Sequence, residues 1–122
     1  MELTVDIGEG CVVVAMRGDL DVTGAADAEA ALTALVIPGH CLVIDMTALD
    51  FIDCCSLGAL LRVQELAWST GGDVVLAAPQ PYVRRLLALT GKDEVFWSHA
   101  SVAAAVAGPP DRGARYAGRR LR

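Results

Sequence analysis

Residues 42–61 read LVIDMTALDFIDCCSLGALL. The run opens with apolar residues in the continuous pattern of a buried strand, and from Leu57 onward apolar residues recur at helical spacing. An acid, two thiols and a hydroxyl lie between the two patterns at residues 53–56, where a helix is expected to begin. A helix start carries unpaired N–H groups and the positive end of the helix dipole, which suit an anion or the acceptor groups of a partner. We therefore expect the functional site at this strand-to-helix junction.

Length and composition indicate one domain of ordinary size with an aliphatic core. The chain has 122 residues, of which 54% are apolar and only 5% aromatic. The longest uninterrupted apolar runs fall far short of the roughly 18 residues that a membrane span needs. The chain opens with Met1 and Glu2 rather than with a basic and then apolar segment, so no secretory signal is expected. We therefore expect a cytoplasmic protein with no membrane partner.

Charge is distributed unevenly along the chain. The net charge is −5, yet residues 109–122 hold five Arg and a single acid, Asp111. The preceding part is therefore clearly acidic and would repel nucleic acid, so no direct nucleic-acid partner is expected. The Gly, Pro and Arg content of residues 109–122 gives that segment no core to join. We expect one domain over residues 1–108 and a basic, disordered tail over residues 109–122.

The polar residues predict neither a metal site nor a catalytic site. The four cysteines form no C-x-x-C pair and have no histidine at ligand spacing, which argues against zinc. Cys11 and Cys41 lie in apolar strand patterns and are expected to be buried. The sequence contains no glycine-rich phosphate loop, no paired-carboxylate signature and no nucleophile patterned with a histidine base. We therefore expect no cofactor and no enzymatic activity.

Hydrophobic periodicity and turn signals predict an α/β fold. Alternating or β-branched runs predict strands at residues 3–7, 11–16, 41–46 and 73–77, with a short strand or edge at 95–96. Helical spacing predicts helices at 25–35, 55–69 and 82–89, the first capped by Thr23, and a last helix through Val106 capped by Ser98 or Ser101. This order implies a mixed β-sheet of about four to five strands, an N-terminal hairpin followed by parallel β-α-β crossovers, packed with about four helices.

Several sequence motifs follow one another along the chain. They are GDLD at residues 18–21, LVIDMT at 42–47, FIDCCSLG at 51–58, GGDV at 71–74 and PYVRRLLALTG at 81–91. Together they resemble the STAS superfamily, and within it the bacterial anti-sigma factor antagonists, over about residues 3–106. The resemblance implies a STAS-like fold and a partner-switching regulator of transcription. Such a protein binds an anti-sigma factor, itself a serine kinase of the GHKL type, and so releases a sigma factor. We expect a monomer or a weak dimer.

The resemblance also implies that the kinase phosphorylates a Ser or Thr at the start of the helix, and that the phosphate breaks the complex. Laid on this chain, the family pattern begins at Asp53, places Cys55 at the acceptor position and places Ser56 at the family's glycine. A thiol is not a normal acceptor for a serine kinase, and one residue along a helix turns a side chain by about 100°. Two interpretations stay open: Ser56 is a substitute acceptor, or the domain is not switched by phosphate.

The residues expected to bind the partner come from the junction and from the acidic segment before the first helix. They are Asp19, Asp21, Asp53, Cys54, Cys55, Ser56, Leu57 and Gly58. Asp53 is also a candidate N-cap, and Cys54 is expected to point into the core. Three other functions are weighed against this one: a redox-responsive regulator in which Cys55 is oxidised, a ligand-sensing STAS domain, and a small hydrolase or phosphotransfer enzyme.

Overall fold

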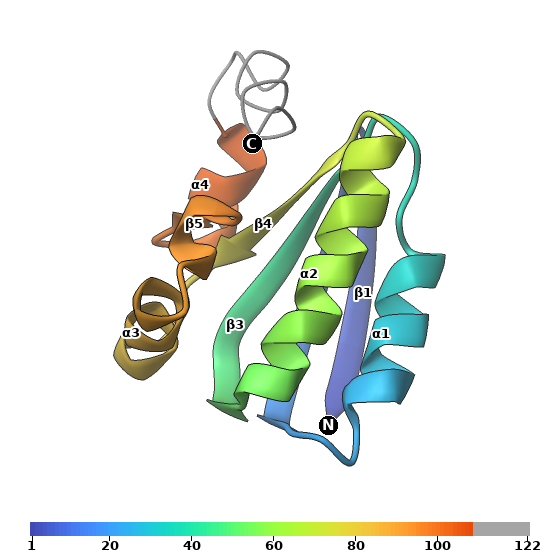
Figure 1. The fold of residues 1–122 in the computed structure, drawn as a ribbon. Helices are drawn as coiled ribbons and strands as arrows, with labels where there is room; N and C mark the ends of the chain where they lie inside the picture. Colours follow the sequence, from blue (N-terminus) through green and yellow to red (C-terminus); the bar gives the residue numbers. More distant parts are fainter. Residues whose placement is uncertain (109–122) are drawn as a thin grey trace.

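The computed structural model describes residues 1–108, which form a five-stranded sheet packed with helices (Figure 1). The strands are β1 (Glu2–Gly8), β2 (Cys11–Leu20), β3 (Cys41–Ile52), β4 (Asp73–Ala77) and β5 (Trp97–His99). The helices are α1 (Ala25–Ala34), α2 (Cys54–Ser69), α3 (Pro81–Leu89) and α4 (Val102–Ala107), with a 3-10 turn, η1, at Lys92–Glu94. The predicted tail, residues 109–122, lies outside the described residues.

The sheet is mixed, as the sequence predicts. Its strands lie in the order β1-β2-β3-β4-β5, with β1 antiparallel to β2 and every other neighbouring pair parallel. The hairpin closes through the turn Glu9-Gly10, where Gly10 takes a positive φ of 74° that suits glycine. Parallel neighbours need a crossover connection, and α1, α2 and α3 each provide one between successive strands.

The central strand β3 is covered on both faces. Leu42 lies in the larger core cluster with residues of α1, α2 and α3, whereas Cys41 and Val43 lie in a smaller cluster with Ala105 of α4. A strand with a side-chain period of two alternates in this way when both of its faces are buried. Cys11 belongs to the smaller cluster too, so both cysteines predicted to be buried are enclosed.

β2 and β3 extend several residues beyond the predicted strands, β1 extends one residue at each end, and the last strand is displaced. β2 continues to Leu20 and β3 to Ile52, because these two residues still pair with each other. Register shifts interrupt the extension, so the regular alternation that predicts a strand is lost there. The last strand is β5 at Trp97–His99 rather than residues 95–96, since η1 and its cap Val95 occupy the preceding positions.

One predicted helix cap is confirmed and another is wrong. Ser101 caps α4, and its hydroxyl accepts a hydrogen bond from the N–H of Ala104 at 3.1 Å. Thr23 does not cap α1, because its hydroxyl donates to Oδ1 of Asp21 at 2.6 Å and Gly24 occupies the cap position. An ionised carboxylate is a stronger acceptor than a neutral oxygen, and it draws the hydroxyl away from the helix.

A buried amide joins α2 to the sheet. The Nε2 of Gln64 donates to Oδ1 of Asp73 at 2.9 Å and to the carbonyls of Val74 and Val95 at 2.9 and 3.0 Å. Its Oε1 accepts from the N–H of Val74 at 2.7 Å, and Trp68 donates to the same Asp73 oxygen at 3.1 Å. Gln64 has no exposed surface, so these bonds replace its lost hydration.

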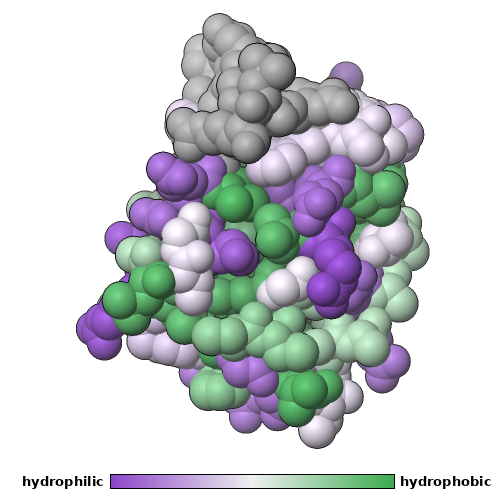
Figure 2. Space-filling view, in the orientation of Figure 1, coloured by the Kyte–Doolittle hydropathy of each residue, from purple (hydrophilic) through white to green (hydrophobic). Residues whose placement is uncertain are grey.

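The face of the molecule that carries α1 and α2 has both apolar and polar surface. Figure 2 shows hydrophobic residues near the middle of this face, with hydrophilic residues around them. Among residues 1–108, no helix combines the length and the apolar character that crossing a membrane would require.

Candidate functional site

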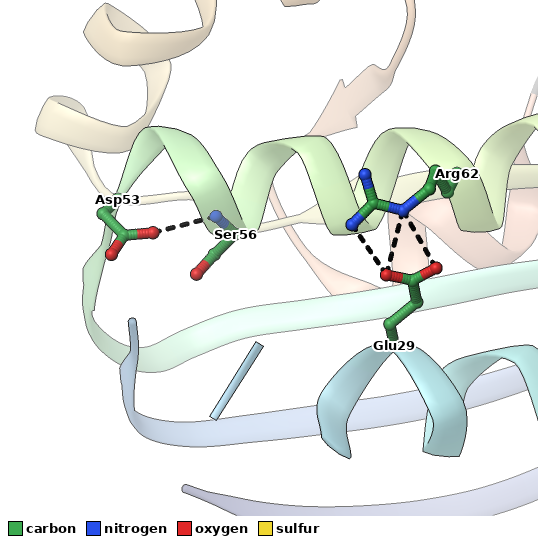
Figure 3. Close-up of polar contacts among 4 residues, drawn as sticks. All are labelled: Glu29, Asp53, Ser56 and Arg62. Atoms are coloured by element: carbon green, nitrogen blue, oxygen red, sulfur yellow. Dashed lines mark hydrogen bonds and ion pairs between the residues drawn. The ribbon is translucent and has the colours of Figure 1, made fainter. Parts of the chain in front are cut away.

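The junction between β3 and α2 is held by a single carboxylate. Asp53 has an extended backbone and is the N-cap of α2, and its Oδ1 accepts from the N–H of Ser56 at 2.8 Å (Figure 3). This bond satisfies one of the N–H groups that a helix leaves unpaired in its first turn. The predicted cap is therefore confirmed, and α2 begins at Cys54, one residue earlier than the sequence predicts.

The same carboxylate also binds the segment between β2 and α1. Oδ2 of Asp53 accepts from the N–H of Val22 at 3.0 Å, and the Asp53 N–H donates to the carbonyl of Leu20 at 3.3 Å. Two segments 31 residues apart in sequence are thereby fixed beside each other. They lie where the parallel strands β2 and β3 end, which is the edge of an α/β sheet where binding sites usually form.

Two carboxylates of this junction titrate below their ordinary range. The pKa of Asp53 is lowered because the nearby Ser56 hydroxyl and the N–H groups of Ser56 and Val22 favour the charged form. The hydroxyl acts through its nearness, since its geometry gives no hydrogen bond to Asp53 and the two N–H groups make the bonds. The pKa of Asp21 is lowered first by the hydroxyl of Thr23, while the negative charge of Asp53 opposes the change. The structure thus brings Asp21 and Asp53 close enough to repel each other, and both stay ionised at neutral pH.

The first turn of α2 divides the predicted site residues between solvent and core. Cys54 and Cys55 are exposed, whereas Ser56 has no exposed surface and Leu57 has 1%. The expectation that Cys54 points into the core is therefore wrong, and so is the placing of Ser56 and Leu57 on the surface. Each residue turns the helix by about 100°, so the buried stripe that contains Leu57 and Leu60 also includes Ser56.

Burial decides whether Ser56 can accept a phosphate. Its Oγ is enclosed and has no hydrogen-bond partner among the described residues, and only its backbone N–H is bound to Asp53. A kinase needs the hydroxyl at the surface, so this conformation gives it no access to Ser56. Cys55, which the resemblance in the sequence predicts at the acceptor position, is exposed and carries a thiol.

Two exposed apolar side chains lie beside the junction and escape the sequence prediction. Val22 is 65% exposed and Phe51 is 44% exposed, on the two segments that Asp53 joins. Alternation would place Phe51 on the same face as the buried Leu49, but the irregular pairing of β2 with β3 breaks that pattern. No signal in the sequence marks Val22, because its exposure follows from a turn formed by Asp21.

We call this surface the junction patch. It comprises two apolar side chains, two thiols and four carboxylates: Val22, Phe51, Cys54, Cys55, Asp19, Asp21, Asp50 and Asp53. Asp19 pairs with Phe51 across β2 and β3 and is exposed, as is Asp50. Gly58, also predicted as a contact residue, is partly exposed one helical turn further on.

Tyr82 of α3 lies close to the acidic side of the patch. Burial is the main cause that raises the pKa of its phenol, and the charges of Asp19 and Asp50 raise it further, while the Ile52 backbone opposes them. A phenol responds to these charges only when it is near them, so α3 adjoins the ends of β2 and β3. The sequence pattern predicts Tyr82 at the start of a helix and indicates no functional role for it.

A salt bridge fixes α2 against α1 beside the thiols. Nε of Arg62 lies 3.0 Å from both carboxylate oxygens of Glu29, and Nη2 lies 2.8 Å from Oε1 (Figure 3). Nη1 of Arg62 lies near Gly58, 3.7 Å from the position that a β-carbon on this glycine would occupy. The pKa of Arg62 is raised mainly by Glu29, with a smaller effect of Cys55, so this cation lies near the exposed thiol.

Among residues 1–108, no three His, Cys, Asp or Glu side chains cluster closely enough to hold a metal.

Comparisons with known proteins agree with the fold and with the resemblance in the sequence. Residues 2–105 match the family model for the STAS domain. A Bordetella bronchiseptica protein, the candidate anti-sigma factor antagonist BtrV, is 31% identical over 97 residues, which span 79% of this chain and 84% of that protein. The crystal structure of an anti-sigma factor antagonist from Mycobacterium paratuberculosis has a TM-score of 0.76 at 29% identity and covers 87% of this chain and 91% of its own.

A second crystal structure extends the likeness of the fold. A candidate anti-sigma factor antagonist from Thermotoga maritima has a TM-score of 0.79, covering 86% of this chain and 92% of its own. Its sequence identity is 19%, so this likeness concerns the fold alone.

Proposed function

The chain belongs to the STAS domain family, and we propose that it is a regulatory protein that binds an anti-sigma factor and so releases a sigma factor. The relatives named as anti-sigma factor antagonists support this class of function. The partner is an anti-sigma factor that is itself a serine kinase of the GHKL type. The protein acts as a binding module, without catalysis of its own.

The observation that carries the proposal is the composition of the junction patch. Val22 and Phe51 expose apolar surface that a partner can desolvate, and ionised carboxylates surround them. Protein interfaces combine such a central apolar anchor with a polar rim that selects the partner by charge. A matching partner surface carries an apolar pocket bordered by Lys or Arg.

With a thiol at position 55, the domain lacks the phosphate switch. Cys55 is the exposed residue at the family's acceptor position, and a phosphate of about −1.5 to −2 charges there would adjoin Asp53. Since a thiol is not phosphorylated by a serine kinase and Ser56 is enclosed, the complex is not dissociated by ATP. The protein then binds its partner constitutively.

Phosphorylation in vitro tests this part of the proposal. The anti-sigma factor kinases of the same organism are incubated with the protein and ATP, and intact masses are recorded. Wild type and Ser56→Ala keep their masses, whereas Cys55→Ser gains one phosphate because it restores an exposed hydroxyl. A phosphate on wild type that disappears in Ser56→Ala would contradict the proposal.

A redox-responsive regulator is the second candidate, and the exposure of both Cys54 and Cys55 favours it. Hydrogen peroxide oxidises a thiolate to sulfenic acid: the sulfur takes one peroxide oxygen as the O–O bond breaks, and hydroxide leaves. The added oxygen enlarges and polarises the side chain. In this case peroxide would weaken partner binding by wild type but not by the double variant Cys54→Ser, Cys55→Ser. If a thiol reagent labels neither residue in the native protein, the redox candidate fails.

The remaining assignments follow from the proposed role. An anti-sigma factor and its sigma factor act on the transcription machinery, so the proposed location is the cytoplasm. The proposed STAS domain spans residues 1–108 and residues 109–122 form a separate basic segment, so a chain that ends at residue 108 should bind the partner like the full chain.

A further inference from the structure

β1 is the outermost strand on one side of the sheet, and six of its seven residues are exposed. Within residues 1–108, β1 pairs only with β2, and its other edge faces away from the sheet. It has seven residues, contains neither Pro nor Lys, and pairs with β2 without a register shift. Pro, Lys and register shifts are features that usually protect an edge strand from pairing with another chain, and β1 lacks all three. Val5 is 43% exposed and Ile7 is 66% exposed on this strand.

The hairpin turn determines which backbone groups point outward. A two-residue turn joins Gly8 to Cys11, and the residues that flank such a turn exchange hydrogen bonds with each other. Inward and outward groups alternate along an antiparallel strand. Thr4 and Asp6 therefore direct their N–H and C=O groups to β2. The groups of Leu3, Val5 and Ile7 face the open edge.

The same alternation separates the side chains. Leu3, Val5 and Ile7 lie on the face that carries α1, since they pair with the core residues Met16, Val14 and Val12. Glu2, Thr4 and Asp6 lie on the opposite face. At this edge, the three residues whose N–H and C=O groups face outward, Leu3, Val5 and Ile7, all have apolar side chains.

Among the antiparallel registers that pair at least five residues of β1 with a copy of itself, only one avoids opposed carboxylates. Pairing centred on Thr4 places Glu2 opposite Asp6 of the copy, and pairing centred on Asp6 places the two Asp6 side chains opposite each other. Like charges in directly opposite positions destabilise a sheet. Pairing centred on Val5 places Thr4 opposite Asp6, Leu3 opposite Ile7 and Glu2 opposite Gly8. Apolar residues then meet apolar ones, and no carboxylate lies directly opposite another.

We propose that a second copy of this chain adds to β1 in antiparallel fashion, with Val5 opposite Val5, and joins two sheets into one. All outward N–H and C=O groups of Leu3, Val5 and Ile7 then find partners in the copy. The exposed Ile7 of each chain comes beside Leu3 of the other, next to a groove that Leu3 lines together with Ala28 and Ala31 of α1. The partner of this edge is thus the protein itself.

The interface rests on one strand from each chain, so the dimer is weak and forms at high protein concentration. The seam lies at the outer edge of the sheet, whereas the junction patch lies where β2 and β3 end. This inference is independent of the proposed function, because it would hold for any partner of the junction patch.

Sedimentation equilibrium across a range of protein concentrations tests the dimer. Wild type shows a mass that rises toward twice the chain mass. Val5→Pro stays monomeric, because it removes an outward N–H and leaves the bonds from β1 to β2 in place. Thr4→Lys, opposite Asp6, tightens the dimer by about 3- to 10-fold and Thr4→Glu weakens it by about the same factor. Equal masses for all four proteins would overturn the proposal.

Cross-linking tests the register itself. In a Cys54→Ser, Cys55→Ser background, Val5→Cys faces its own copy and forms a disulfide-linked dimer on mild oxidation, since opposed residues have Cα atoms about 5.5 Å apart. The control Thr4→Cys faces Asp6 instead and does not cross-link. Cross-linking of Thr4→Cys at the rate of Val5→Cys, or of neither, would exclude this register.

Discussion

The two halves of α2 use polar side chains in opposite ways. In its first turn, Asp53 and the thiols after it stay in contact with solvent, and the carboxylate binds only backbone N–H groups of two neighbouring segments. In its third turn, Gln64 is enclosed and takes part in four hydrogen bonds to the sheet and the turn before β5. The buried and fully hydrogen-bonded Gln64 therefore helps to specify the fold, whereas the exposed polar side chains of the first turn remain available to bind a partner.

The largest effect is expected from breaking the buried half. Gln64→Leu keeps the volume and removes every hydrogen bond of the amide, leaving the N–H of Val74 without its acceptor inside the core. The free energy of unfolding should fall by about 3 kcal/mol in urea denaturation. Its exposed neighbour Glu65 provides the control, because Glu65→Leu should change stability by no more than about 0.5 kcal/mol. Similar losses for the two variants would contradict the distinction between the halves.

A smaller effect is expected from the cap at the exposed half. Asp53→Ala removes the acceptor of both the Ser56 and Val22 N–H groups, so the denaturation midpoint falls, whereas Asp53→Asn keeps a capping oxygen and most of the stability. The lowered pKa of Asp53 adds a pH dependence. Its stabilisation is complete above the ordinary value of 3.8 and is lost as the pH falls through the lower folded-state pKa.

Thermal denaturation between about pH 6 and pH 2 measures this contribution. The difference in midpoint between wild type and Asp53→Asn should narrow as the pH falls, because the carboxylate is protonated in wild type. A difference that stays constant over this range would show that the charge of Asp53 does not stabilise the junction.

The smallest effect is expected from Ser56, which lies in the first turn of α2 but on its buried face. Its hydroxyl is enclosed without a partner among the described residues, so Ser56→Ala removes a polar group that the fold does not satisfy. Stability should stay the same or rise by about 1 kcal/mol, as measured by urea denaturation. Cys55→Ala on the exposed side serves as the control and should leave stability within about 0.5 kcal/mol. A loss of more than about 1 kcal/mol in Ser56→Ala would reveal a hydrogen bond of this hydroxyl.

Much of the fold could be predicted because its signals are local. The β-branched runs of the hairpin, the buried strand before Asp45 and the helical spacing after Leu57 each follow from period and propensity within a short window. The extensions of β2 and β3 could not be predicted, because paired strands with shifted register lose their alternation. The predicted cap at Thr23 was wrong because the nearby carboxylate of Asp21 binds the hydroxyl instead.

The candidate site was only partly predictable. Asp53 and Cys55 follow from their place at a helix start, and the helical period explains why Ser56 turns inward once α2 is known to begin at Cys54. Val22 and Phe51 become visible only when Asp53 brings their segments together. A hydrogen bond across 31 residues leaves no pattern in the sequence around either end.

The central claim is that the junction patch binds the anti-sigma factor, and calorimetric titration of one pair of variants tests it most directly. Val22→Asp adds a charge in the middle of the patch, whereas Leu89→Asp makes the same change at a residue that is 78% exposed at the end of α3. With the anti-sigma factor kinase and ADP, Val22→Asp should weaken binding by about 30-fold or more, and Leu89→Asp should bind like wild type. Wild-type affinity in Val22→Asp, or an equal loss in both variants, would contradict the account.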